Sequence, residues 1–186
     1  MSLLTKAISY AAEKHDGQTR KGTDIPYIVH PMEAATIAAT ITNNENVIAA
    51  AVLHDVVEDC GVSLQEIEIL FGEQIAKLVA ADSEDKREYL SAESTWKTRK
   101  QETLDAIAIM DKDSRIVVLS DKLSNIRAMY RDYAIFGDDL WKRFNCKDTC
   151  EQGWYYKSIA KLLKDDLIDT DAWIEYSELV NFLFED

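Results

Sequence analysis

The scarcity of glycine and proline is the feature that most limits what this chain can fold into. The 186 residues include 6 glycines and 2 prolines, whereas these two residue types make up about 12% of an average protein. Tight turns between strands depend on them, so an architecture rich in β-hairpins is disfavoured. Apolar residues recur instead at helical spacing along most of the chain. The sequence therefore predicts an all-α helical bundle.

Apolar spacing and end signals divide the first 131 residues into a series of helices. A polar loop over 16–29, which contains Gly17 and Gly22, is expected to separate the first two. Ser63 and Glu66 form a capping-box pattern at the start of a later helix. The expected helices cover about 3–15, a stretch from near Pro31, 45–58, a stretch from Ser63, one after Gly72 to about 82, one capped by Ser94 that reaches Met110, and 114–131.

Two regions are less sharply defined by their pattern. The apolar run 116–119 (IVVL) is short enough to be a buried strand, and periodicity alone does not decide between strand and helix. The helical interpretation is favoured because the sequence offers no second strand for it to pair with. Residues 138–186 are expected to add two or three helices. From residue 132 onward there are 13 acidic and 6 basic residues, a net charge of −7, which is typical of a solvated face.

Length, charge and cysteine content narrow the classes of protein. A chain of 186 residues is typical of one domain, and its net charge of −13 disfavours nucleic-acid binding. No apolar run approaches the ~20 residues of a membrane span, and the first residues do not resemble a signal peptide. The three cysteines form no Cys-x-x-Cys pair, which predicts reduced thiols and a cytoplasmic protein. The oligomeric state stays open.

Two histidines and two aspartates lie within or beside apolar stretches. His54 and Asp55 end an apolar helix, Asp121 follows the run 116–120, and His30 lies where a loop meets a helix. Any one of these histidines alone would more often be an ordinary core residue. Buried carboxylates are normally paired or metal-bound, however, and a mixed nitrogen and oxygen set suits Mn²⁺, Fe²⁺, Zn²⁺ or Mg²⁺. The four residues together are therefore candidate metal ligands.

Further polar residues follow these candidates at helical spacing. Glu58 and Asp59 come one turn after the His-Asp pair, so both acids are expected on the same face of one helix. A carboxylate there can orient a metal-bound water or accept its proton. Asn125 comes four residues after Asp121, which predicts an amide group next to the metal.

A local excess of positive charge lies near the start of the chain. Residues 1–31 carry 4 basic and 3 acidic side chains, a net of +1 in a protein of −13. Arg20 and Lys21 could therefore hold a phosphorylated ligand, since a guanidinium grips phosphate or stacks on a base and an ammonium supplies a point charge. His15, in the same region, is expected to have a structural role.

Three segments, taken in order, resemble one known family. They are 12–31 (AEKHDGQTRKGTDIPYIVHP), 50–59 (AAVLHDVVED) and 119–127 (LSDKLSNIR). The order H…HD…D resembles the HD superfamily of metal-dependent phosphohydrolases, and the segments are similar to the RelA/SpoT-type (p)ppGpp hydrolase domain over about residues 5–131. The resemblance implies an HD-domain helical bundle that binds one divalent metal, typically Mn²⁺, through His30, His54, Asp55 and Asp121.

The same resemblance implies a reaction and a role for each remaining residue. Glu58 and Asp59 would activate the attacking water, Arg20 would pack against guanine, and Lys21 and Asn125 would hold the nucleotide. The implied reaction removes the 3′-pyrophosphate of (p)ppGpp and gives GDP or GTP and pyrophosphate. The chain is too short for the synthetase and regulatory parts of the long enzymes, so it is expected to be a small stand-alone hydrolase.

The sequence departs from the family pattern at several places. Val56 and Ser124 replace the usual Thr and a frequent His, and the segments 83–100 and 143–156 differ from the long enzymes. Two alternatives therefore stay open. One is hydrolysis of another phosphorylated nucleotide, such as the 2′-phosphate of NADPH, and the other is an alarmone-binding module without turnover. A module of that kind has no need of Glu58 and Asp59, which favours an enzyme.

Overall fold

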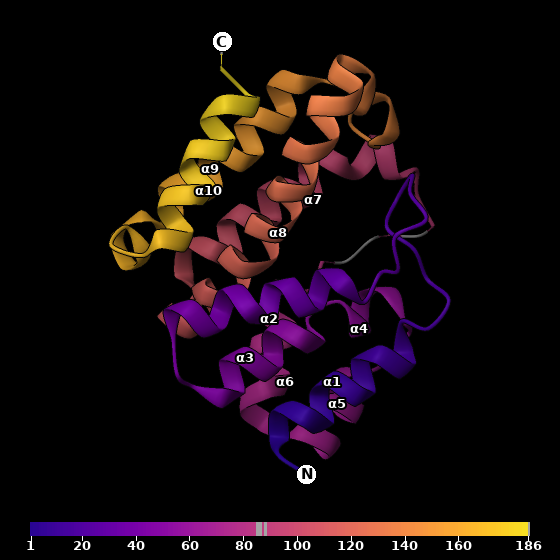
Figure 1. Ribbon diagram of the computed structural model, residues 1–186, viewed down its shortest axis with the longest axis vertical. Coiled ribbons are helices and arrows are strands. Elements are labelled where there is room, and N and C mark those ends of the chain that lie inside the picture. The colour runs from indigo at the N-terminus through magenta and orange to yellow at the C-terminus, as the bar shows by residue number, and fades with distance from the viewer. Residues whose placement is uncertain (85–86, 88, 186) are drawn as a thin grey trace.

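The computed structural model describes residues 1–84, 87 and 89–185, and its regular structure is helical (Figure 1). Within that part of the chain, β-type pairing is limited to one isolated bridge between Thr19 and Pro26. The all-α prediction is confirmed. The helices are α1 (Leu3–Lys14), α2 (Val29–Ile41), α3 (Glu45–Leu53), α4 (Val56–Asp59), α5 (Leu64–Phe71), α6 (Glu73–Asp82), α7 (Ala92–Ile109), α8 (Lys112–Phe136), the 3₁₀ helix η1 (Gly137–Arg143), α9 (Thr149–Leu167) and α10 (Asp171–Leu183).

Several helices begin at a polar residue whose side chain caps the first turn. The Ser63 hydroxyl accepts a hydrogen bond from the backbone N–H of Glu66, as the capping pattern predicts. The run 116–119 lies inside α8, so the helical interpretation is confirmed. The expected cap at Ser94 is wrong. α7 begins one turn earlier, after Ser91, and the Ser94 hydroxyl donates to the Ser91 carbonyl oxygen.

The prediction of one continuous helix over 45–58 is also wrong, because a turn at His54 and Asp55 divides it into two helices. α3 ends at Leu53, and α4 begins at Val56. The imidazole Nδ1 of His54 lies 2.8 Å from the carbonyl oxygen of Ala51, one of the carbonyls that a helix end leaves without a backbone partner. Since apolar residues continue on both sides of the turn, periodicity gives no sign of the break.

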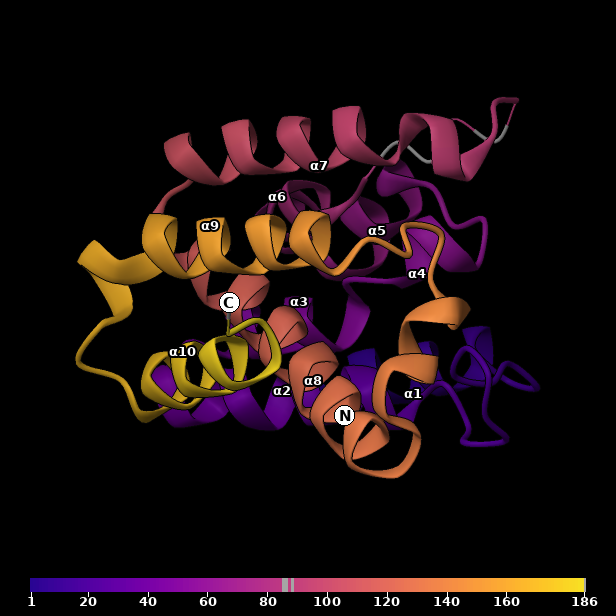
Figure 2. The same cartoon turned by 90° about the horizontal axis from the view of Figure 1, so that it is seen from above.

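Helix α8 lies between two groups of helices (Figure 1). On one side it packs against α2, α3 and α6, and on the other against α9 and α10. Figure 2 shows α7 running beside α9. The centre of the first group is α3, where residues 49–53 (AAAVL) are completely buried. Small alanine side chains on α2 and α3 bring these helices close together, which holds the polar residues at their ends in fixed places.

None of the described helices has the length and hydropathy that crossing a membrane requires.

Candidate active site

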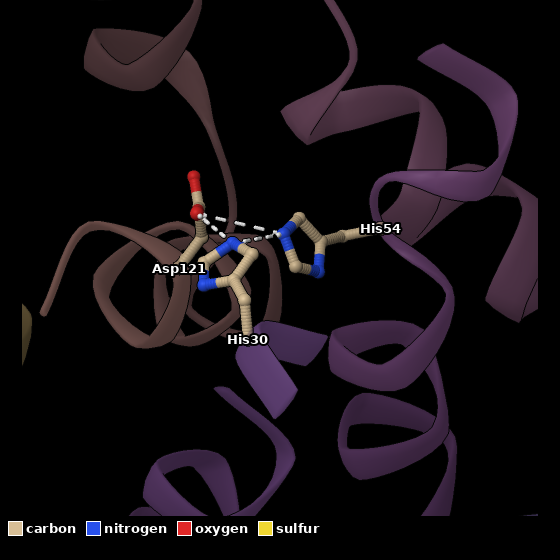
Figure 3. Close-up of side chains that lie close together, drawn as sticks. All are labelled: His30, His54 and Asp121. Carbon is tan, nitrogen blue, oxygen red and sulfur yellow. Dashed lines mark hydrogen bonds and ion pairs between the residues drawn. The ribbon is translucent and has the colours of Figure 1, made fainter. Parts of the chain in front are cut away.

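Three buried side chains from separate elements converge beside α8 (Figure 3). His30 comes from the first turn of α2, His54 from the turn after α3, and Asp121 from the middle of α8. The Nε2 atoms of the two histidines are 3.2 Å apart, and Asp121 Oδ1 lies 3.0 Å from Nε2 of His30. Asp55 Oδ2 lies 3.0 Å from Nε2 of His54. The structure therefore brings together all four residues that the sequence suggests as metal ligands.

Hydrogen bonds behind the two imidazoles determine which nitrogen faces the cluster. The Ala51 carbonyl oxygen can only accept, so Nδ1 of His54 carries the proton. Nδ1 of His30 lies 2.8 Å from Oγ of Ser124, whose own proton goes to Oε2 of Glu33, also at 2.8 Å. Nδ1 of His30 is therefore a donor as well. In the neutral form of each imidazole, the lone pair of Nε2 therefore faces the other ring.

Two lone pairs and two carboxylate oxygens facing one another require a positive charge between them. Burial opposes a charged imidazole, yet Asp55 and Asp121 outweigh it and hold the pKa of His54 well above its usual range. Burial likewise opposes a charged Asp55, but His54 and His30 hold its pKa well below the usual range. Adjacent ligands of a cation with bonds of about 2.1 Å lie about 3 Å apart. The observed spacing and donor set fit a divalent metal ion.

The two oxygens of Asp121 have different partners. Oδ1 faces the histidines and accepts a 2.6 Å hydrogen bond from Nδ2 of Asn125. Oδ2 is paired with the ammonium of Lys122, which also lies 3.4 Å from Asp82 Oδ1. Burial opposes a charged Lys122, but Asp121 and Asp82 hold its pKa well above the usual range. Lys122 and Asn125 therefore fix the plane of the carboxylate and leave Oδ1 directed at the cluster.

Tyr27 links the metal cluster to one of the two further acids. Its hydroxyl lies 2.7 Å from Asp55 Oδ2 and 2.8 Å from Asp59 Oδ2, and it can donate its one proton to either. Burial, reinforced by Asp55 and Asp59, raises the pKa of Tyr27 far above its usual value, so the hydroxyl stays a donor. Oε2 of Glu58 accepts from the backbone N–H of Glu84 at 3.2 Å.

Two cavities flank the cluster and share Tyr27, His30 and Asn125. The first, called the charged cavity, has a volume of about 220 Å³ and a mainly polar lining. Both members of the Glu58–Asp59 pair line it, although they lie on α4 and the predicted helix is broken before them. Besides the shared residues, its lining includes Asp55, Glu58, Asp59, Lys100, Lys122 and Tyr155.

The second, called the apolar cavity, has a volume of about 280 Å³ and a mainly apolar lining. Arg20 lines it with its guanidinium 5.4 Å from the ring centre of Tyr27, and donates to Oδ1 of Asn125 at 2.6 Å. Lys21 also lines it and donates to Asn145 at 3.3 Å. Besides the shared residues, its lining includes Arg20, Lys21, Ile25, Met129, Leu140 and Phe144.

Sequence reasoning missed several residues at this site. Lys100 of α7 and Tyr155 of α9 line the charged cavity, yet neither belongs to a recognisable motif. Lys100 comes from the segment 83–100, of which residues 85, 86 and 88 lie outside the described part of the chain. Tyr27 and Lys122 lie within the quoted segments, where their closeness in sequence to the proposed ligands His30 and Asp121 was an available signal. His15 bonds Gln18 within its own loop at 2.8 Å, in keeping with a structural role.

A family model described as an HD domain matches residues 7–144. The chain belongs to the HD domain family. This HD domain chain is 36% identical over 129 residues to a Synechocystis protein named "Probable guanosine-3′,5′-bis(diphosphate) 3′-pyrophosphohydrolase", with 68% of this chain and 17% of that protein covered. It is 33% identical over 196 residues to an Aquifex aeolicus protein named "Guanosine-3′,5′-bis(diphosphate) 3′-pyrophosphohydrolase", with 98% and 26% covered. The chain thus spans less than a third of either relative.

A solved structure matches over almost its whole length. It is described as a metazoan ortholog of SpoT that hydrolyzes ppGpp, and it is 25% identical to this HD domain chain with a TM-score of 0.78. The match covers 98% of this chain and 96% of the other. The family that the three sequence segments resemble is therefore confirmed, as is the helical HD fold.

Proposed function

We propose that this HD domain chain is a metal-dependent hydrolase that removes the 3′-pyrophosphate of (p)ppGpp and gives GDP or GTP and pyrophosphate. The observation that carries the proposal is the convergence of two Nε2 lone pairs and two carboxylates between an apolar and a charged cavity. The names of the two relatives and the activity stated for the solved structure support this choice of substrate.

One divalent metal, with Mn²⁺ as our choice, would be held by His30, His54, Asp55 and Asp121. The set has two imidazole nitrogens and two carboxylate oxygens and no thiolate. Such a set suits Mn²⁺, whereas a set rich in thiolates would suit a softer metal ion. When bound, the cation supplies Lewis acidity, which polarises a phosphate oxygen and lowers the pKa of water.

The charged cavity supplies the groups for proton transfer and for charge. Glu58 and Asp59 orient the attacking water, and one of the two carboxylates accepts its proton and returns a proton to the ribose 3′-oxygen as the bond from that oxygen to phosphorus breaks. The hydroxyl of Tyr27, 2.8 Å from Asp59 Oδ2, positions the Asp59 carboxylate. The ammonium of Lys100, which also lines the charged cavity, offsets the negative charge of the pyrophosphoryl group that is transferred to the attacking water.

The apolar cavity receives the nucleoside. Arg20, already held above the ring of Tyr27, packs its planar guanidinium against the guanine base. Asn125 contacts the sugar side of the nucleotide between the two cavities, and Lys21 pairs with phosphate. Because Cys60, Cys146 and Cys150 are all free thiols, we also propose that the protein works in the cytoplasm, where thiols stay reduced.

Product analysis tests the proposal directly. Purified protein loaded with Mn²⁺ is incubated with ppGpp, and GDP, pyrophosphate and phosphate are quantified. We expect equal amounts of GDP and pyrophosphate, with both metal binding and turnover lost in Asp55→Ala. The matched control is Asp165→Ala, an exposed aspartate of α9, which should behave as the wild type.

Three other results would contradict the proposal. If the protein releases phosphate in place of pyrophosphate, or turns over NADPH faster than ppGpp, its substrate is a different nucleotide. Tight binding of ppGpp with metal bound and no product would identify a binding module.

A further inference from the structure

A continuous series of polar contacts leads from His30 to the C-terminal helix α10. Nδ1 of His30 donates to Ser124 Oγ, and Ser124 donates to Oε2 of Glu33, each at 2.8 Å. The other oxygen of Glu33 accepts from Nη1 of Arg127 at 3.1 Å. Arg127 in turn grips Glu175 of α10 through two hydrogen bonds of 2.6 and 2.5 Å. We call Ser124, Glu33, Arg127 and Glu175 the His30 relay.

The spacing of these residues makes the relay a product of helix packing. His30 and Glu33 are three residues apart on α2, and Ser124 and Arg127 are three residues apart on α8. Residues at this spacing lie on one face of a helix, so each helix presents a pair to the other. α2 and α8 pack directly against each other, and α10 packs on α8.

The hydrogen bonds from His30 through Ser124 to Glu33 all run in one direction, from donor to acceptor. A serine hydroxyl has a single proton, and here Glu33, an anion, accepts it. Ser124 can therefore only accept from His30, which keeps the proton of the imidazole on Nδ1 and the lone pair on Nε2. The carboxylate behind the hydroxyl makes it a stronger acceptor, and a stronger bond at Nδ1 makes Nε2 a better metal ligand.

We propose that the His30 relay sets the metal affinity of the site, with Ser124, Glu33, Arg127 and Glu175 acting as positioning residues for His30. The inference rests on the proposed function in so far as His30 is taken as a metal ligand. It assigns the acidic C-terminal region a part in the site, because Glu175 orients Arg127 and Arg127 orients Glu33.

The relay has little to contribute to stability. The side chains of Glu33, Arg127 and Glu175 keep 27–40% of their surface exposed, and exposed ion pairs stabilise a fold only slightly. A loss of metal affinity in their variants therefore cannot come from general unfolding. Removing partners behind a metal-bound histidine typically lowers metal affinity about 10- to 100-fold.

The test is calorimetric titration of the metal-free protein with Mn²⁺, together with its melting temperature. We expect Glu33→Gln and Ser124→Ala to weaken Mn²⁺ binding at least about tenfold. Glu175→Gln, at the far end, should weaken it about two- to fivefold. The controls are Ser120→Ala, a buried serine of α8 that bonds the Ile116 carbonyl, and Glu178→Gln, an exposed acid of α10. Both should bind Mn²⁺ as the wild type does.

The outcomes separate the relay from the proposed function. If Glu33→Gln and Ser124→Ala bind Mn²⁺ within twofold of the wild type, the relay is wrong, while turnover of ppGpp by the wild type would leave the proposed function intact. If the wild type binds no divalent metal, both fail. Should Ser124→Ala not fold, Glu33→Gln decides the question, since its partly exposed side chain can be changed without opening the core.

Discussion

The charged cavity and the apolar cavity share one wall but differ in what forms the rest. Tyr27, His30 and Asn125 belong to both. Acids and lysines from α4, α7 and α8 give the charged cavity its polar lining. Carbon-rich side chains from α8, η1 and the loop before α2 give the apolar cavity its apolar lining. A ligand with one flat apolar end and one multiply charged end matches this division. A nucleotide has both ends.

Under the proposed function, this difference separates the groups for chemistry from the groups for recognition. Groups able to move a proton lie in the charged cavity, so substitutions there should alter kcat. The apolar cavity offers contact area and the Arg20 guanidinium, so substitutions there should alter KM. Four predictions test this separation.

The largest effect is expected at Glu58. Glu58→Gln keeps the shape of the side chain but cannot accept a proton from water, so kcat for ppGpp should fall about 10²- to 10⁴-fold. Mn²⁺ affinity and KM should stay near wild-type values, because Glu58 is not among the four clustered residues. Steady-state kinetics and calorimetry check this, with Glu68→Gln, an exposed acid of α5, as control. An unchanged kcat would remove Glu58 from the reaction.

Arg20 should show the opposite kinetic pattern. Arg20→Ala removes the guanidinium that lies over Tyr27 and bonds Asn125, so KM for ppGpp should rise about 10- to 50-fold with a smaller change in kcat. Lys147→Ala, which removes an exposed cation outside both cavities, serves as control. A fall in kcat with constant KM would show that Arg20 acts in the chemical step and that the apolar cavity is not limited to substrate recognition.

Lys100 makes the charged cavity sensitive to pH. Burial, with Lys122 and Arg99 nearby, lowers the pKa of Lys100 to about 8. The ammonium is charged below that pH and is lost as the pH rises through it, so kcat/KM should decline by roughly tenfold between pH 7 and pH 9. Lys100→Arg keeps its charge over this range and should lose this decline. Superimposable pH profiles for the two proteins would exclude Lys100 as the cause.

The smallest effect is expected at the rim of the apolar cavity. Ile25 lines this cavity but is 48% exposed, so Ile25→Ala removes only part of a buried contact and should raise KM about two- to threefold. Ile69→Ala makes the same change at a 76% exposed position on α5 and should leave KM unchanged. An effect on kcat at Ile25 would contradict the assignment of this wall to recognition.

The sequence predicted which four side chains come together better than it predicted their surroundings. His30, His54, Asp55 and Asp121 each sit at the end or centre of an apolar stretch, where an ionisable residue stands out from its neighbours. The turn at His54 escaped prediction because apolar residues continue on both sides of it, while the His54 side chain contacts the Ala51 carbonyl oxygen. A contact of this kind leaves no trace in the apolar spacing.

The far wall of the charged cavity could not be predicted from local pattern. Lys100 reaches the site only because α7 packs beside α9, and Tyr155 only because α9 packs on α8. Neither pairing has a sequence signal. The acidic character of the last third predicted a solvated face, and the part exposure of Glu175 agrees with this. Its contact with Arg127 depends on how α10 lies across α8.

Because Asp121, Lys122, Ser124, Asn125 and Arg127 all lie on α8, their mutual orientation is set by the helix itself. Inserting or deleting one residue between Asp121 and Asn125 would turn everything beyond it by about 100° and shift it by about 1.5 Å along the axis. The Asn125 amide would then lose its hydrogen bond to Asp121, and the Arg127 guanidinium would lose its hydrogen bond to Glu33. The number of residues along this stretch is therefore as important to the site as their identity.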